Sequence, residues 1–351
     1  MYLEQILETA INAKASDIHM TVGLPPIARV NGSLLHMGVQ ELTAEEIDQY
    51  AQQILSERLY KTYKEDGECD SSYSYKDISN FRVNVFNQRN RCCIVMRLIP
   101  SVVPSLESLE LPDVFRKLCM KRSGLILVTG PTGSGKTTTL AAMIDYMSHN
   151  RNEHIITIED PIEYLLPHGS GIVTQRQLGT DTKSFSSAIR AALREDPDVI
   201  VVGEMRDLET IAAAITAAET GHLVLSTLHT IGAANTVDRI IDVFPAEQQT
   251  QIRFQLSGVL EAVISQRLVP NRMNDGRMMA LEIMLASNGI ANLIREGKTN
   301  QITNAMQLGR DEGMITMDQS LLQLYKSGAI DEKNLLKYAV DFQAMEKLIG
   351  D

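Results

Sequence analysis

The sequence predicts an α/β protein with two domains: a small α+β domain at the amino terminus and a larger domain built around a parallel sheet and ending in helices. The chain has 351 residues, and 44% of them are hydrophobic, which is enough to bury two separate cores. The first hundred residues mix short strand patterns with amphipathic helices, whereas the following part alternates apolar strands with helices. We place the domains at residues 1–98 and 113–351, joined by a linker at residues 99–112.

The amino-terminal domain is predicted from two helical patterns and four strand patterns. Helices with apolar residues at helical spacing are expected from Leu3 to Lys14 and from Ala44 to Tyr63. Strands are expected at Asp17 to Val22, Ile27 to Val30, Phe81 to Phe86 and Cys92 to Leu98. The spacing of Pro100 and Pro104 then indicates an extended linker.

The larger domain is predicted from four short apolar runs that alternate with helical segments. These runs lie at Leu125 to Thr129, His154 to Ile158, Val199 to Val202 and Leu223 to Thr227. Such runs indicate a parallel sheet that is covered by helices on both faces. From about residue 246 the pattern predicts helices alone, at Ala246 to Gln266, Met317 to Lys326 and Glu332 to Phe342.

The composition excludes several classes of function. A net charge of −11 and a pI near 5.2 argue against a nucleic-acid partner, because phosphate neutralisation requires a basic face. The four cysteines form no C-x-x-C pair, so we expect reduced thiols and a cytosolic location. Neither a signal peptide nor an apolar run near about 18 residues is present, so no integral membrane segment is expected. Peripheral association with a membrane through a partner stays open.

A phosphate-binding motif, G-x-x-x-x-G-K-[ST], occupies Gly130–Thr137. It follows a predicted strand and opens a predicted helix from Thr137 to Tyr146, which is the context that the motif requires. Its backbone N–H groups surround a β-phosphate, Lys136 reaches the β- and γ-phosphates, and the Thr137 hydroxyl binds Mg²⁺. The sequence therefore predicts ATP and Mg²⁺ as cofactors. The expected nucleotide-binding residues are Gly130, Thr132, Gly133, Ser134, Gly135, Lys136, Thr137 and Thr138.

Acidic residues follow two other predicted strands. Glu204 ends a hydrophobic strand, the arrangement by which phosphate-loop proteins hold the metal and its waters, although it is also placed to cap the next helix. Glu159, Asp160 and Glu163 lie within five residues at the end of another strand. We expect Glu163 to position the attacking water, and Glu159 and Asp160 to organise the metal shell with Thr137 and Glu204. The alternative is a loop of solvated acids.

Two histidines, His222 and His229, flank the predicted strand within Gly221–Thr230. A histidine at a strand end can hydrogen-bond a phosphate or a carboxylate, so each is a candidate sensor of the γ-phosphate. A purely structural role is the alternative for both.

Taken together, these segments resemble the four boxes of the type IV pilus retraction ATPases, the PilT family, within the secretion ATPases. The boxes are Walker A (Gly130–Thr138), the Asp box (Ile158–Tyr164), Walker B (Asp198–Asp207) and the His box (Gly221–Thr230). The resemblance implies a PAS-like amino-terminal domain, a RecA-like ATPase domain and a hexameric motor for pilus retraction. It also implies an inner-membrane platform protein as partner, and a cytoplasmic location at the inner face of the cytoplasmic membrane.

The amino-terminal domain resembles the family through Ala15–His19, Gly23–Pro26 and Phe81–Asn84. In such motors this domain packs on the neighbouring subunit's nucleotide, and its arginines complete that site. The resemblance gives this role to Arg82 and Arg97. Surface ion pairs on strands are the alternative for both residues.

Two features favour retraction over pilus assembly. The sequence lacks the four-cysteine zinc insertion and the long additional amino-terminal region that are usual in extension motors. Gly289–Lys298 resembles the AIRNLIRE box of the retraction family but departs from it at Gly289, Ile290 and Ala291, which removes one arginine. The alternatives are an accessory nucleotide-binding subunit of a pilus motor and a pilus-assembly or type II secretion ATPase.

Overall fold

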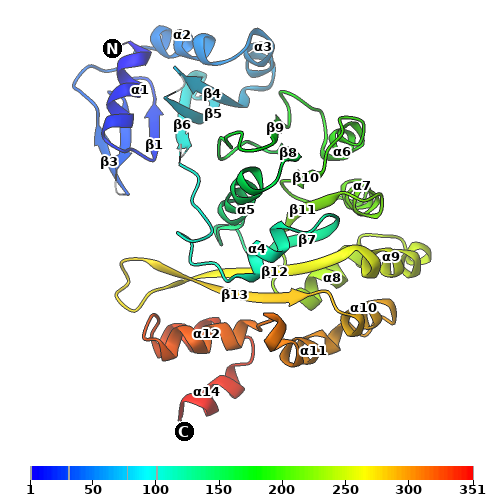
Figure 1. Cartoon of the computed structure of the whole chain (residues 1–351). Coiled ribbons are helices and arrows are strands. Elements are labelled where there is room, and N and C mark those ends of the chain that lie inside the picture. Colours follow the sequence, from blue (N-terminus) through cyan, green and yellow to red (C-terminus); the bar gives the residue numbers. More distant parts are fainter. Residues whose placement is uncertain (1, 31, 77, 100–101, 351) are drawn as a thin grey trace. The chain divides into compact units, whose positions relative to one another are not determined.

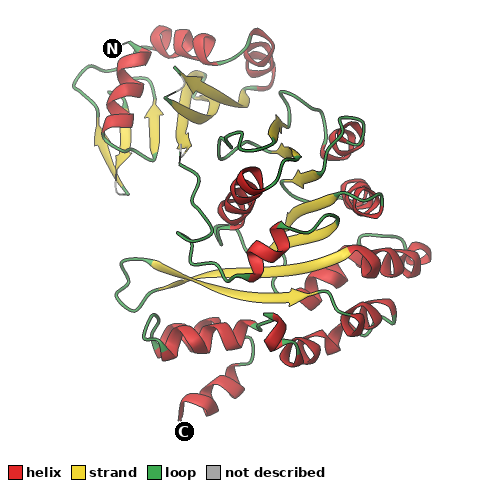
Figure 2. Ribbon diagram, in the orientation of Figure 1, coloured by secondary structure: helices red, strands yellow, loops and turns green. Residues whose placement is uncertain are grey.

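The computed structural model describes residues 2–30, 32–76, 78–99 and 102–350. The chain divides into two compact units, one made of residues 1–103 with 161–165 and the other of residues 104–160 with 166–351. Both units combine helices with a sheet (Figures 1 and 2). The α/β class predicted from the sequence is confirmed.

The first unit is built on a six-stranded sheet whose described pairs are antiparallel, in the order β3-β2-β1-β6-β5-β4. Its strands are β1 (Asp17–Met20), β2 (Ile27–Val30), β3 (Ser33–His36), β4 (Glu68–Tyr75), β5 (Ser79–Gln88) and β6 (Arg91–Ile99). Its helices are α1 (Leu3–Asn12), α2 (Ala44–Ile54) and α3 (Glu57–Asp66). Apolar residues from all three helices pack with alternate strand residues in a single core.

The sequence misplaced three elements of this unit. The single helix expected from Ala44 to Tyr63 is two helices, because Ser56 caps a new one by accepting a hydrogen bond from Leu59 N. Strand β3 was not predicted because all four of its residues are exposed. Strand β4 was not predicted because small polar residues such as Ser71 share its buried face with Cys69.

The second unit contains a seven-stranded sheet in the order β13-β12-β7-β11-β10-β8-β9. Every pair from β12 to β9 is parallel, and β13 pairs antiparallel with β12. The strands are β7 (Gly124–Thr129), β8 (His154–Glu159), β9 (Ile172–Gln177), β10 (Val199–Val202), β11 (Leu223–Leu228), β12 (Leu260–Pro270) and β13 (Arg277–Leu285). The four strands predicted from apolar runs, β7, β8, β10 and β11, are confirmed.

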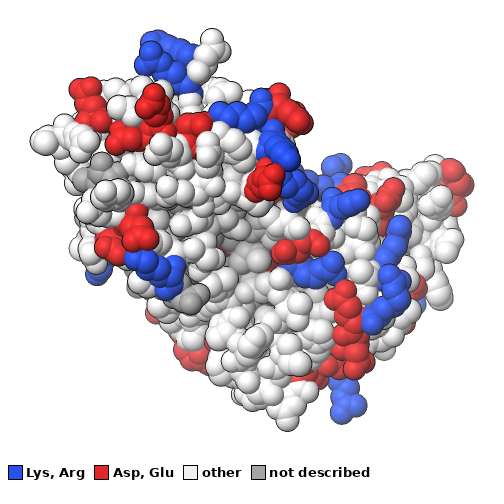
Figure 3. Space-filling view, turned by 90° about the horizontal axis from the view of Figure 1, so that it is seen from above, with Lys and Arg blue, Asp and Glu red and all other residues white. Residues whose placement is uncertain are grey.

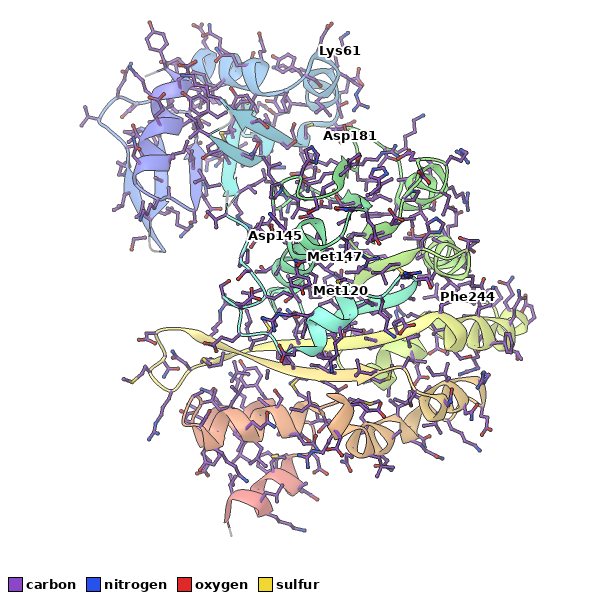
Figure 4. All side chains as sticks on the ribbon, viewed as in Figure 1. Lys61, Met120, Asp145, Met147, Asp181 and Phe244 are labelled. Carbon is purple, nitrogen blue, oxygen red and sulfur yellow. The ribbon has the colours of Figure 1, made fainter. Side chains whose placement is uncertain are left out.

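Helices cover both faces of this sheet, as predicted. Alternate residues of β7, such as Ile126 and Val128, pack with α4 (Val114–Cys119) and α5 (Lys136–Asn150), whereas Leu125 and Leu127 belong to the core of the other face. The helices of that other face are α6 (Phe185–Ala192), α7 (Leu208–Glu219), α8 (Ala233–Asp242), α9 (Ala246–Val259), α10 (Asn288–Arg295) and α11 (Ile302–Leu308). Figure 4 labels one core residue from each side, Met147 on α5 and Phe244 just after α8.

The prediction of helices alone from about residue 246 is wrong. Helix α9 ends at Val259, and the chain continues as β12, which forms a long antiparallel hairpin with β13. Strand β12 lies between β7 and β13 and is largely buried, so its apolar run has no alternation to distinguish a strand from a helix. The expected carboxyl-terminal helices follow the hairpin as α12 (Met317–Lys326), α13 (Glu332–Tyr338) and α14 (Phe342–Gly350).

The surface charges and the cysteines add little to the assignment of a functional site. Acidic and basic side chains are interspersed on the face shown in Figure 3. The four cysteines are buried, and no disulfide joins them in the part of the chain that the structure describes. Within the same residues, no helix combines the length and the apolar character needed to cross a bilayer.

Candidate nucleotide site

The phosphate-loop motif forms a tight turn between β7 and α5. Gly133 and Gly135 have φ angles of 78° and 88°, in the left-handed region that glycine adopts without strain. At Gly130 a side chain is excluded by contact, because an added Cβ would lie 2.3 Å from the backbone oxygen of Gln266. The glycines of the motif are therefore required by backbone conformation and by close packing against β12.

Lys136 is the first residue of α5 and lies within the turn. Its side chain is buried, and Nζ donates hydrogen bonds to Gly130 O at 2.9 Å and Pro131 O at 3.2 Å. Thr137 and Thr138 follow in the first helical turn and are half-buried. The N–H groups of a helix start, an adjacent ammonium and a hydroxyl make a site suited to phosphate oxygens and to a hard cation.

Glu204 and His229 lie at the same edge of the sheet as the phosphate loop. Gly130 N donates to Leu228 O, so the chain enters the loop next to the residue that precedes His229. His229 Nε2 lies 3.5 Å from Glu204 Oε2, and Arg206 Nε lies 2.8 Å from the other oxygen of that carboxylate. Neighbouring strands thus bring a carboxylate and a histidine to one side of the loop.

The backbone on both sides of Glu204 is fixed by hydrogen bonds. Thr227 Oγ1 donates to Gly203 O at 2.6 Å, and Met205 N donates to Thr227 O at 3.1 Å. The next helix is capped by Asp207, which accepts a hydrogen bond from Thr210 N. A capping role therefore does not explain Glu204, whose carboxylate instead faces Arg206 and His229 at this edge of the sheet.

Glu159, the first acid of the other predicted cluster, lies away from Thr137 in the sheet. Glu159 ends β8 and accepts hydrogen bonds from Thr157 Oγ1 at 2.6 Å and from Gln175 Nε2 at 2.9 Å. Three strand spacings, about 14 Å, separate β8 from β7 in the sheet. Asp160 is exposed, and Glu163 is an exposed residue of the segment 161–165, which belongs to the first unit.

The spacing of β7 and β8 does not allow Thr137 and Glu159 to be direct ligands of one metal ion, so the predicted shell of Thr137, Glu159, Asp160 and Glu204 requires contacts through water. Among the described residues, no group of three or more His, Cys, Asp or Glu side chains is arranged to hold a metal ion. Mg²⁺ bound with a nucleotide usually takes few protein ligands and keeps several waters, so the Thr137 hydroxyl remains a fitting ligand.

The two predicted histidines lie at opposite ends of β11. His222 precedes the strand, its carbonyl accepts a hydrogen bond from Gly124 N, and its ring Nδ1 lies 3.0 Å from Ala217 O. The six residues of β11 span about 20 Å, and His229 lies at the far end. Of the two candidate sensors of the γ-phosphate, His229 therefore lies at the edge of the phosphate loop and His222 at the opposite edge, because a strand sends its two ends to opposite edges of the sheet.

In the first unit, the two predicted arginines are neighbours on one face of the sheet. Arg82 and Arg97 pair across β5 and β6, and Arg97 pairs in turn with Asp17 on β1. Arg97 Nε donates to Asp17 at 2.9 Å, so the ion-pair alternative fits Arg97. Burial raises the pKa of Asp17, but hydrogen bonds from Arg97 and Ser16 outweigh it, and the net pKa is below the usual value. Arg82 and Arg97 are both exposed.

Residues on β12 and β13 that were not predicted from the sequence also border the loop. Gln266 donates from Nε2 to Ser134 O at 2.7 Å. A cavity of about 500 Å³ adjoins residues 131–134, and Arg267 and Arg277 contribute to its lining. The polar residues Ser265, Gln266 and Arg267 inside an otherwise apolar run were the signal that these positions face something other than core.

A phosphate loop after a central strand of a mostly parallel sheet, with a carboxylate and a histidine after neighbouring strands, defines a P-loop ATPase. The chain belongs to the family of type II/IV secretion system proteins, which it matches over residues 1–337.

Comparison with individual proteins narrows the family further. The chain is 46% identical over 334 residues to the type IV pilus retraction ATPase PilT of Pseudomonas aeruginosa, covering 95% of this chain and 97% of that protein. It is 47% identical over 320 residues to a twitching motility protein of Neisseria gonorrhoeae, covering 91% of this chain and 86% of that protein. The crystal structure of the pilus retraction motor PilT with bound ADP has the same fold, with a TM-score of 0.93, 45% identity and 99% of both chains covered. The predicted membership of the retraction ATPase family and the ATPase activity are confirmed.

Proposed function

We propose that this chain is the ATP-driven motor that powers the retraction of a type IV pilus, working as a ring of six copies at the inner face of the cytoplasmic membrane. The observation that carries the proposal is the Glu204–His229 pair beside the phosphate loop, in a chain 46% identical to a retraction ATPase. A subunit that only bound nucleotide would need the loop but not an acid and a histidine beside it.

The residues of the chain divide the work of hydrolysis between them. The loop N–H groups and Lys136 bind the phosphates, and Thr137 holds Mg²⁺ with Glu204 acting through water. Bound MgATP supplies the phosphoryl group and the charge of the metal. Glu163 orients the attacking water, and His229, held near Glu204, senses whether the γ-phosphate is present. Glu159 and Asp160 support this edge of the sheet as polar neighbours rather than as metal ligands.

Arg82 and Arg97 complete the site of a neighbouring subunit in this proposal. Both guanidinium groups are exposed on one face of the first unit's sheet, where another chain can reach them. An arginine supplied across an interface neutralises charge that develops during phosphoryl transfer, and it links hydrolysis to the movement of one subunit against the next.

Mixing two inactive variants tests the ring mechanism. Arg82→Ala and Lys136→Ala should each have almost no ATPase activity alone. A mixture should recover activity, because some interfaces combine an intact Arg82 from one chain with an intact Lys136 from another. Phosphate release is measured as the mixing ratio is varied, and native mass spectrometry checks that the rings are mixed. A fully active monomer whose turnover does not depend on protein concentration would exclude the ring mechanism.

Two alternatives make different predictions for the same protein. An accessory subunit would bind nucleotide without releasing phosphate, whereas an assembly or secretion ATPase would hydrolyse ATP but would not restore pilus retraction in a bacterium that lacks its own retraction motor.

An inner-membrane platform protein is the proposed partner, and its co-purification with the ring tests that interaction. Chelation of Mg²⁺ should abolish turnover in the proposed motor.

A further inference from the structure

Gln266 contacts the phosphate loop with both its backbone and its side chain. Ser265 pairs with Thr129 across β12 and β7, so Gln266 lies beside Gly130, where the loop begins. Its backbone oxygen occupies the space next to Gly130, and its side-chain Nε2 donates to Ser134 O at 2.7 Å. The same Nε2 would lie 3.3 Å from a Cβ at Gly135. Gln266 is completely buried, so these contacts are shielded from water.

The hydrogen bond to Ser134 O sets the direction of the peptide group that joins Ser134 to Gly135. In a trans peptide the C=O and N–H bonds point in opposite directions. Because the Ser134 oxygen is held toward β12, the Gly135 N–H points away from β12, into the turn where the phosphates bind. Gly135 has a φ of 88°, and glycine can adopt either orientation of such a peptide without strain. A partner outside the loop is therefore needed to select one orientation.

Core packing alone does not account for a glutamine at this position. Gln266 Oε1 and Ser134 Oγ are buried, and neither has a hydrogen-bond partner among the described residues. Burial of an unpartnered polar atom is unfavourable, and an apolar side chain of similar length would fill the same space without that penalty. Such an apolar residue would not supply the hydrogen bond that Gln266 Nε2 donates to Ser134 O.

We propose that Gln266 is a positioning residue for nucleotide binding: it holds the Ser134–Gly135 peptide so that the Gly135 N–H is directed at the phosphates. The inference rests on the proposed role of the loop as the phosphate site. Gln266→Met keeps the length of the side chain and removes the donor. MgADP should bind to this variant about tenfold more weakly and the KM for ATP should rise, while kcat changes less and the thermal midpoint stays the same or rises.

Gln249 offers a matched control in the same unit. Its side-chain Nε2 also donates to a backbone carbonyl, Phe244 O, at 3.1 Å, but that carbonyl follows α8 rather than belonging to the phosphate loop. Gln249→Met makes the same chemical change and should leave the affinity for MgADP unchanged.

The experiment is titration of MgADP into the purified full chain, for wild type, Gln266→Met, Gln249→Met and Lys136→Ala, with thermal unfolding of each. The proposal is supported if Gln266→Met binds MgADP more weakly than wild type at an unchanged thermal midpoint, while Gln249→Met keeps the wild-type affinity. Wild-type affinity in Gln266→Met, or a lower midpoint with unchanged affinity, overturns it and leaves Gln266 a core residue. A wild type that binds no MgADP would overturn the nucleotide site itself, and this inference with it. If Gln266→Met does not fold, Gln266→Leu provides the same comparison.

Discussion

The two edges of the parallel sheet both carry charged and polar side chains, but these side chains have different partners. At the carboxyl-terminal edge, His229 lies 3.5 Å from Glu204; the histidine side chain is half-exposed, whereas the glutamate side chain is mostly buried. At the amino-terminal edge, His222 lies against Ala217 O, and His154 Nδ1 lies 3.1 Å from Glu195 O. At the first edge the histidine faces a carboxylate, whereas each of these two histidines at the second edge contacts a backbone carbonyl.

The direction of the strands explains this difference. Each parallel strand enters its following helix from its carboxyl end, so helix starts such as those of α5, α7 and α8 gather at one edge. Free N–H groups at helix starts favour phosphates and acids, which is why ligands of open parallel sheets bind there. Helix ends gather at the opposite edge, and their free carbonyl groups take up the donors of nearby histidines and arginines.

The largest expected effect of a substitution at the carboxyl-terminal edge is that of Lys136→Ala. Lys136 is the buried cation of the loop, so its removal should lower ATPase turnover by about 100-fold or more. Phosphate release measures the effect, and circular dichroism checks that the variant is folded. Turnover at the wild-type rate in a folded Lys136→Ala protein would contradict the assignment of this edge.

The two histidines give a second prediction because they lie at opposite ends of the same strand. His229→Ala should lower turnover by about 10- to 100-fold with little change in stability, since its side chain is 46% exposed and faces Glu204. His222→Ala should keep turnover within about twofold and lower the free energy of unfolding by about 1 kcal/mol, because it loses its bond to Ala217 O.

Steady-state kinetics and urea unfolding of both histidine variants separate the two roles. Equal losses of turnover would contradict the contrast between the edges, and would place His222 at a contact with another subunit.

The same contrast shows what the sequence was able to predict. The phosphate loop could be assigned because its spacing carries its own local geometry, and Glu204 because an acid that ends an apolar strand is a local pattern. His222 and His229 have equivalent positions in the pattern, at the two ends of one apolar run. Only the direction of β11 within the sheet separates them, and that direction depends on pairing with strands far away in the sequence.

The hairpin of β12 and β13 was missed for a related reason. Leu260–Pro270 is buried between two neighbouring strands, so it lacks the alternation that identifies a strand in the sequence. With that strand misread as helix, Gln266 could not be placed beside Gly130. Glu163 shows a further limit of prediction from the sequence. The three acids Glu159, Asp160 and Glu163 were grouped because they are close in sequence, but the segment 161–165 belongs to the first unit of the fold.

The smallest expected effect on activity comes from the amino-terminal edge, at Arg151. This residue follows α5 and is buried, and its Nη1 donates to Cys119 O at 2.6 Å and to Lys121 O at 2.8 Å. Its Nη2 lies 2.5 Å from Glu153. Arg151→Met removes three interactions from a buried position and leaves two carbonyl groups and a carboxylate without their cation. The free energy of unfolding should therefore fall by about 2–4 kcal/mol, while turnover per folded molecule stays within about twofold.

Arg206→Met at the carboxyl-terminal edge is the matched control for Arg151→Met. The Arg206 side chain is 71% exposed, so its pair with Glu204 is screened by water, and its loss should change the free energy of unfolding by less than about 1 kcal/mol. Because Arg206 lies beside Glu204, we expect Arg206→Met to change the rate of ATP turnover instead. Urea unfolding and phosphate release are measured on both variants at protein concentrations at which the rings are intact. We assign stability mainly to the amino-terminal edge and catalysis to the carboxyl-terminal edge. This assignment would be contradicted by an Arg151→Met protein that is stable but has lost turnover. It would also be contradicted if Arg206→Met lost more stability than Arg151→Met.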